Sequence, residues 1–346
     1  MILDGLSPVT MAAAIDRAAH ALRAGELVAF PTETVYGLGA DATSDMAVAG
    51  IFKAKGRPSN HPLIVHVAAG DAGHPARLTE ALSRFAEPLP AFAHRLIDAF
   101  WPGPLTLIVT RQPGVAAASA GGQNTIGLRC PAHPVAQALL AACAAQGVPG
   151  IAGPSANRFG RVSPTTAAHV HHEFGDTVLV LDGGPCQIGI ESTIVDCSRG
   201  VPVLLRPGAI TRTQIEVACG EALRTRDQVA SPDPRAPGTL AAHYAPNATL
   251  RLMDATSLQA ALDVLGAEAA SAASIAIWAR TPLRSRSARI VQRRMPDDAA
   301  ATAQQLFATL REFDAQGARL IWVETPPDTP EWEGVRDRLQ RAAAAA

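Results

Sequence analysis

Short apolar runs alternate with helix-spaced segments along most of this chain, and this alternation does most to narrow the folds available to it. The runs LVAFP (27–31), PLIVHVA (62–68) and LTLIVTR (105–111) have the length and composition of buried strands. Residues 45–54, by contrast, carry apolar side chains at helical spacing. Because the connections include hairpin-like and crossover types, we expect an α/β fold with a mixed, twisted sheet.

The same patterns continue to the end of the chain and suggest two blocks. Further strands are expected at 125–130, 148–152, 177–184, 191–197 and 202–208, with helices from Ser7-Pro8 to Gly25 and at 133–146 and 164–173. In the second block, strands at 248–253, 274–279, 289–293 and 318–323 alternate with helices at 256–270, 297–316 and 331–345. This block is typical of a small doubly wound, Rossmann-like domain.

A stretch of weak periodicity separates the two blocks. Its later part, RDQVASPDPRAPGTLAAHYAP, is rich in proline and has the composition of a linker. We therefore expect three parts: a catalytic domain at 1–210, a linker at 211–246 and a smaller α/β domain at 247–346.

Composition excludes several classes of protein. With 48% apolar and 18% charged residues, the chain can bury large cores, and its formal net charge of −1 provides no global field for nucleic acids or membranes. The five cysteines include no CxxC pair, which favours free thiols in a reducing compartment, and we expect a cytoplasmic protein. The first residues, MILDGLSPVT, lack the pattern of a signal peptide.

Lysine occurs at only two positions, Lys53 and Lys55, although the chain has 30 basic Lys and Arg residues. Both lie in FKAKGRPSNHP (52–62), where Arg57 follows at once. Because an ammonium and a guanidinium are not interchangeable around phosphates, this segment is a candidate cradle for a polyanion. A solvated basic helix end explains the pattern equally well.

Hydroxyl groups collect where a strand ends, in PTETVYGLG (31–39), which carries Thr32, Thr34 and Tyr36. Open α/β sheets bind ligands at such ends. A loose dinucleotide fingerprint and an ordinary capped turn are the alternatives. Farther on, Arg129 ends a strand in TIGLRCPAHP, where it can clamp a carboxylate or form a surface ion pair.

Two later segments add small polar groups. The loop GPSANRFGRVSPT (153–165) is suited to phosphates or to helix capping, and it contains Ser155, Asn157, Ser163 and Thr165. The motifs ESTIVD (191–196) and LRPG (205–208) end adjacent strands with Ser192, Thr193 and Arg206. The histidines of HVHH (169–172) would spread around a helix, so we expect no protein metal site there.

Cations, hydroxyls and glycines together suit phosphoryl or nucleotidyl chemistry that works by positioning and charge stabilisation. The sequence contains no P-loop and no signature of covalent catalysis. His61 and His66 flank the strand at 62–68 and are structural or functional. The alternative from a different class is an RNA-binding module with a basic concave face and no turnover.

These motifs together resemble the threonylcarbamoyl-AMP synthase family in its long two-domain form, with a YrdC-like catalytic domain and a C-terminal accessory domain. They are PTETVYGLG, AKGRP with NHPLIVHV, TIGLR, PSAN with GR and SPT, ESTIVD, LRPG, and APG with HYAP, in that order within residues 20–246. His61 stands where the family often has Asn, and Gly153 where it often has Ala.

The resemblance implies a nucleotidyltransferase that converts L-threonine, bicarbonate and ATP into threonylcarbamoyl-AMP and pyrophosphate, for N6-threonylcarbamoyladenosine formation on tRNA. It assigns the catalytic cations Lys55 and Arg57. The residues carried over to threonine are Thr34, His66, Arg129 and Ser192. Those carried over to ATP are Lys55, Arg57, His61, Thr125, Ser155, Asn157, Ser163, Arg206 and Tyr244.

The resemblance also implies how the site is completed. Mg2+ is expected on the ATP phosphates rather than in a protein cage, and partners from tRNA modification are possible without a stable nucleic-acid complex. The segment APGTLAAHYAP (236–246) is expected to act as a lid, with His243 and Tyr244 closing on ATP and the reactive intermediate.

Overall fold

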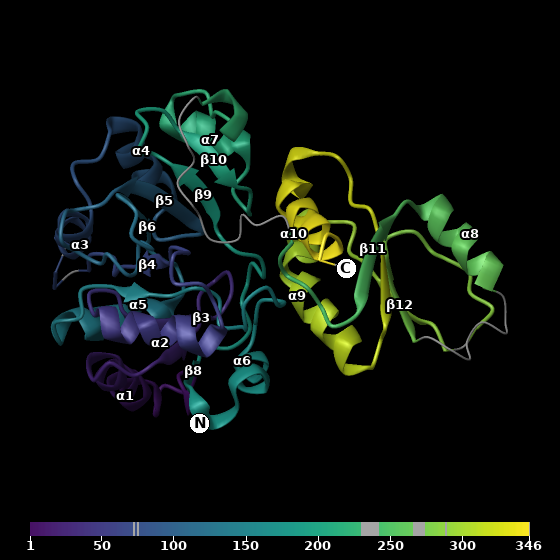
Figure 1. Cartoon of the computed structure of the whole chain (residues 1–346), viewed down its shortest axis with the longest axis horizontal. Helices are drawn as coiled ribbons and strands as arrows, with labels where there is room; N and C mark the ends of the chain where they lie inside the picture. The colour runs from purple at the N-terminus through teal and green to yellow at the C-terminus, as the bar shows by residue number, and fades with distance from the viewer. Residues whose placement is uncertain (72, 75, 230–241, 266–273, 288, 346) are drawn as a thin grey trace. The chain divides into compact units, whose positions relative to one another are not determined.

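The computed structural model describes residues 1–71, 73–74, 76–229, 242–265, 274–287 and 289–345. The chain forms two compact units (Figure 1). The first comprises Met1–Phe159 and Ser163–Thr239, and the second comprises Gly160–Val162 and Leu240–Ala346. Most of the expected lid, residues 236–241, lies outside the described residues.

A mixed sheet organises the first unit. Among the described residues it contains ten strands in the order β1-β8-β2-β3-β7-β4-β6-β5-β9-β10. The strands are β1 (Ile2–Asp4), β2 (Val28–Phe30), β3 (Gly37–Asp41), β4 (Ile64–His66), β5 (Leu105–Thr110), β6 (Thr125–Arg129), β7 (Ile151–Ala152), β8 (Leu179–Asp182), β9 (Thr193–Asp196) and β10 (Val203–Arg206). Since β4 runs parallel to β6 while β5 runs antiparallel to it, the expected mixed sheet is confirmed.

Helices cover the sheet and bury its apolar side chains. They are α1 (Met11–Arg23), α2 (Asp45–Lys55), α3 (Arg77–Phe85), α4 (Ala91–Phe100), α5 (Pro134–Ala145), α6 (Ala167–Phe174) and α7 (Arg212–Cys219), with short 3-10 turns at Gly175–Thr177 and Arg226–Gln228. One apolar cluster joins α1 and α5 to Val28, Phe30 and Ile151. A larger cluster joins α2, α4 and α7 to the other strands.

The stretch 211–246, expected to be a linker throughout, begins with helix α7. Thr211 and Gln214 form a capping box at its start, and Ile215 and Cys219 are buried on its inner side. Only two buried side chains in eight residues make the periodicity weak, which is why the sequence pattern did not indicate this helix.

The second unit is a smaller α/β domain. Its elements are β11 (Thr249–Met253), α8 (Ala255–Leu265), β12 (Ile275–Ala279), β13 (Val291–Arg294), α9 (Ala299–Ala315), β14 (Leu320–Glu324), a 3-10 turn at Pro330–Trp332 and α10 (Glu333–Ala343). The strand order is β11-β14-β12-β13, and every paired strand is parallel. Within this unit α9 and α10 lie on one side of the sheet and α8 on the other (Figure 1), which confirms the doubly wound arrangement. Residues 266–270 of the expected helix lie outside the described residues.

No helix in the described part of the chain combines the length and apolar character that a membrane-spanning segment requires.

Candidate active site

The hydroxyl-rich turn after β2 is folded by its own side chains. Thr32 Oγ1 accepts the backbone N–H groups of Thr34 and Val35, each at 3.2 Å, and donates to the carbonyl of Val35 at 2.7 Å. Such local side-chain bonds replace a regular ladder and fix a tight turn. Thr34 Oγ1 lies 2.9 Å from Thr32 Oγ1, so the hydroxyl of Thr34 has a defined position inside the protein.

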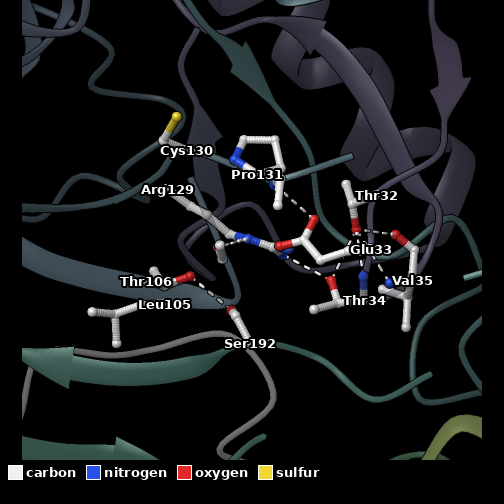
Figure 2. A network of polar contacts seen from close by, with 12 residues as sticks. Thr32, Glu33, Thr34, Val35, Leu105, Thr106, Arg129, Cys130, Pro131 and Ser192 are labelled. Carbon is white, nitrogen blue, oxygen red and sulfur yellow. Dashed lines mark hydrogen bonds and ion pairs between the residues drawn. The ribbon is translucent and has the colours of Figure 1, made fainter. Parts of the chain in front are cut away.

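Arg129 ends β6 directly beside this turn. Its Nη1 donates to Thr34 Oγ1 at 2.8 Å, its Nη2 to Glu33 Oε1 at 2.6 Å and its Nε to the carbonyl of Gly103 at 3.3 Å (Figure 2). Arg129 is only 3% exposed. The ion pair it forms is therefore buried, not the surface pair that the sequence left open.

His66 is the register partner of Arg129 across the parallel β4–β6 pair. Burial, reinforced by the charge of Arg129, lowers the pKa of His66 to about 3, so the ring is neutral near pH 7. Its edge packs against Phe30, with ring centres 5.4 Å apart, and its Nδ1 has no hydrogen-bond partner among the described residues. The neutral ring can hydrogen-bond a ligand without adding charge beside Arg129.

Ser192 lies just before β9 and forms hydrogen bonds with residues of both β5 and β10. Its Oγ lies 2.7 Å from Thr106 Oγ1, and Arg206 Nη2 donates to that Oγ at 3.1 Å and to the carbonyl of Ser192 at 2.9 Å. Gly208 is needed nearby because a Cβ there would lie 2.5 Å from the backbone nitrogen of Thr193. The ESTIVD and LRPG motifs thus meet, with Arg206 buried beneath Ser192.

Lys55 is the last residue of α2 and binds the loop at residues 153–165, here called the SAN loop. Its Nζ donates to the carbonyls of Ser155, at 2.6 Å, and of Asn157, while its own carbonyl accepts the N–H of Phe159 at 2.9 Å. The chain then turns away at Gly56, whose φ of 64° is left-handed and suits glycine. Both ends of this one lysine therefore organise the loop.

The electrostatic surroundings of Lys55 are unusual for a lysine. Burial, with the adjacent charge of Arg57, holds the pKa of Lys55 well below its ordinary value. The Arg57 guanidinium donates to the carbonyl of Pro62 at 3.0 Å and lies 5.6 Å from the ring centre of Phe159. His61 packs on the same ring, 5.5 Å between centres, so Phe159 joins the KAKGR segment to the SAN loop.

Three further residues predicted for ATP are Ser163, Asn157 and Thr125. Ser163 Oγ donates to Glu191 Oε1 at 2.5 Å, and Asn157 Nδ2 donates to the carbonyl of Arg158 at 2.7 Å. Thr125 begins the strand that Arg129 ends, so their Cα atoms are about 13 Å apart.

Tyr244 is a buried residue of the second unit. Its ring lies 5.4 Å from that of Phe307 on α9, and the guanidinium of Arg338 on α10 lies over it at 5.4 Å. His243 packs edge-on against it at 4.1 Å. Its backbone φ of 63° is left-handed, which is unusual for a residue other than glycine.

Three buried site residues received no role from the sequence alone: Glu33, Thr106 and Glu191. Glu33 is the one charged residue of PTETVYGLG, and Glu191 begins ESTIVD beside a buried strand, and an acid in such a position was a usable signal. Across the described ranges, no group of three or more His, Cys, Asp or Glu side chains is arranged to hold a metal ion.

The first unit carries buried cations and hydroxyls at the ends of a mixed α/β sheet, and a small doubly wound unit follows it. This combination is that of a two-domain α/β protein with an anion-binding site. A family profile described as "Telomere recombination" matches residues 20–208, and one described as "Threonylcarbamoyl-AMP synthase, C-terminal domain" matches residues 210–344. The chain belongs to the threonylcarbamoyl-AMP synthase family, as its motifs indicated.

Individual relatives agree with this assignment over nearly the whole chain. The threonylcarbamoyl-AMP synthase of Bacillus subtilis is 38% identical, over 95% of this chain and 92% of its own length. That of Schizosaccharomyces pombe is 35% identical, over 98% and 90%. A crystal structure of P. abyssi Sua5 complexed with L-threonine is similar with a TM-score of 0.86 and 33% identity, covering 100% of this chain and 98% of that one.

Proposed function

We propose that this chain is an L-threonylcarbamoyladenylate synthase, a nucleotidyltransferase that converts L-threonine, bicarbonate and ATP into threonylcarbamoyl-AMP and pyrophosphate. The observation that carries the proposal is the buried group formed by Thr34, His66 and Arg129, which joins a carboxylate-binding cation to a hydroxyl and a neutral imidazole. Similarity to a threonine-bound relative over the whole chain supports the same function.

The threonine subsite is proposed around Arg129. Its guanidinium binds the threonine carboxylate through charge-assisted hydrogen bonds. The hydroxyls of Thr34 and Ser192 and the neutral ring of His66 supply polar contacts for the rest of the amino acid. The amine nitrogen of threonine forms a bond to the carbon of bicarbonate, water is lost, and the product is a carbamate.

The ATP subsite is proposed around Lys55, Arg57 and Arg206. The carbamate oxygen attacks the α-phosphorus, the bond to the bridging oxygen breaks, and pyrophosphate leaves. Preorganised cations offset the charge that builds up on the α-phosphate and the leaving group. Mg2+ is proposed to arrive on the ATP phosphates, as a part of that substrate.

Further polar residues of the first unit are proposed to complete the nucleotide site. They are His61, Thr125, Ser155, Asn157 and Ser163. The mixed anhydride formed is reactive, and its proposed use is N6-threonylcarbamoyladenosine synthesis on tRNA with partner proteins. That use implies that the protein acts in the cytoplasm.

The test is pyrophosphate release by the purified full chain with ATP, Mg2+, bicarbonate and L-threonine. Release is expected only when threonine and bicarbonate are both present, and mass spectrometry should detect threonylcarbamoyl-AMP. Equal release without threonine would refute the proposal. An RNA-binding module would instead show no turnover and a steeply salt-dependent affinity for RNA.

A further inference from the structure

Glu33 is a buried acid at the centre of the site that the proposed reaction does not use. It is only 6% exposed, and both of its carboxylate oxygens accept hydrogen bonds. Oε1 accepts from Arg129 Nη2 at 2.6 Å, and Oε2 accepts from the backbone N–H of Ala132 at 3.1 Å. Figure 2 shows the side chain of Glu33 extending from the turn after β2 toward Arg129.

Glu33 is one of three groups that hold Arg129. The guanidinium also donates to Thr34 Oγ1 and to the carbonyl of Gly103, so its plane is fixed by three groups from two segments of the chain, the turn after β2 and Gly103. Each terminal nitrogen carries two N–H groups and uses one in these contacts. Counting contacts with the described residues, one N–H on each terminal nitrogen is left for a ligand carboxylate, which is the number a bidentate pair requires.

The chemistry at this position requires a carboxylate. Both oxygens face N–H donors, and only an ionised carboxylate is an acceptor at both ends. A glutamine would turn its NH2 group toward either Arg129 or the N–H of Ala132. Glu33 also compensates the charge of a buried guanidinium, which would otherwise be costly to keep away from water.

We propose that Glu33 is a positioning residue for threonine recognition: it orients Arg129 so that the two remaining N–H groups face the threonine carboxylate. The inference rests on the proposed function of the site. Glu33 could instead weaken threonine binding, because its negative charge lies beside the substrate carboxylate and competes with it for Arg129. The two roles predict opposite changes in threonine affinity when Glu33 loses its charge.

The experiment measures L-threonine binding to the full chain by titration calorimetry without ATP, together with pyrophosphate release at varied threonine and varied ATP. For Glu33→Gln we expect the Kd and KM for threonine to rise about tenfold or more, equivalent to about 1.4 kcal/mol, with the KM for ATP changed less than about twofold. An unchanged or tighter threonine Kd, or an equal rise in both KM values, would overturn the proposal.

A matched control lies in the second unit. Glu324 is also buried, with Oε1 2.9 Å from Arg280 Nη2 and Oε2 accepting the N–H groups of Arg280 and Thr281 at 2.7 Å. Glu324→Gln should lower the melting temperature without moving the KM for threonine. A threonine-selective change in this variant too would show that the effect is one of general stability, and would overturn the role of Glu33.

Two provisions keep the test decisive. If Glu33→Gln does not fold, Glu33→Asp keeps the charge but is too short to reach both donors, and the same threonine-selective change is expected at smaller size. Threonine binding by the unaltered chain without pyrophosphate release would refute the proposed function while leaving the positioning role of Glu33 measurable.

Discussion

Lys55 gives the sharpest test of how the site is organised, because a conservative substitution should fail there. Its Nζ is buried and donates to two carbonyls of the SAN loop, those of Ser155 and Asn157. A planar guanidinium is larger than an ammonium, and because Lys55 is only 3% exposed, an arginine there would have to displace neighbouring groups. We therefore expect Lys55→Arg to be nearly as damaging as Lys55→Ala.

The size of the effect follows from the contacts. Hydrogen bonds from a charged group contribute about 1.5–3 kcal/mol each, so the two carbonyl bonds position the loop with about 3 kcal/mol or more. If half of that is lost in the transition state, kcat/KM falls about tenfold, equivalent to about 1.4 kcal/mol. We expect at least this loss for both variants, and their kcat/KM values should differ by less than about threefold.

The assay is pyrophosphate release under kcat/KM conditions, with thermal unfolding measured alongside. Lys53→Arg is the matched control, because Lys53 lies on the same helix but is exposed, and it should keep the unaltered activity. Near-normal turnover by Lys55→Arg would refute the argument that this position requires a compact charge.

Three further outcomes can be measured. Arg129→Ala should remove about 2–3 kcal/mol of threonine binding energy, so the KM for threonine should rise while the KM for ATP stays nearly unchanged. An equal rise in both KM values would exclude a carboxylate clamp. His66 has a folded pKa of about 3, below its unfolded value, so the unfolded chain binds the extra proton as pH falls. The free energy of unfolding should therefore decrease below about pH 6.5 by up to about 1.4 kcal/mol per pH unit, and denaturant titrations of His66→Gln should show a shallower acid dependence; an identical slope would contradict the buried neutral ring. Gly208→Ala should destabilise the protein by about 1–3 kcal/mol, because the new Cβ would lie 2.5 Å from the nitrogen of Thr193, and an unchanged melting temperature would contradict that close approach.

The strands and helices that sequence predicted well are those with strong apolar patterns. Strands β5 and β12 are buried at nearly every position, and α2 starts and ends at a clear serine cap and glycine stop. Strand β1 was not expected, since it has three residues and its exposed Ile2 lies at the edge of the sheet. Local pattern has no information on an element whose stability comes from pairing with β8, far along the chain.

The site residues could likewise be predicted from local pattern, but their long-range partners could not. The sequence indicated Thr34 and Arg129 because each follows or ends a recognisable strand, and Lys55 because lysine is rare in this arginine-rich chain. It did not indicate that Arg129 would pair with Glu33, because the two are separated by 96 residues and meet only through the sheet. Nor did it indicate that the partners of Lys55 would be backbone carbonyls, which any residue type supplies.

The position of Ser192 has a thermodynamic consequence. Its hydroxyl lies against Thr106, while Arg206, proposed to bind ATP, holds the same hydroxyl and its carbonyl. A phosphate that draws Arg206 toward itself acts on Ser192, and an amino acid that takes the hydroxyl acts on Arg206. Such linkage is reciprocal: any factor by which ATP alters the affinity for threonine must equal the factor by which threonine alters the affinity for ATP. Two calorimetric titrations, each with the other ligand present and absent, would therefore measure one shared quantity.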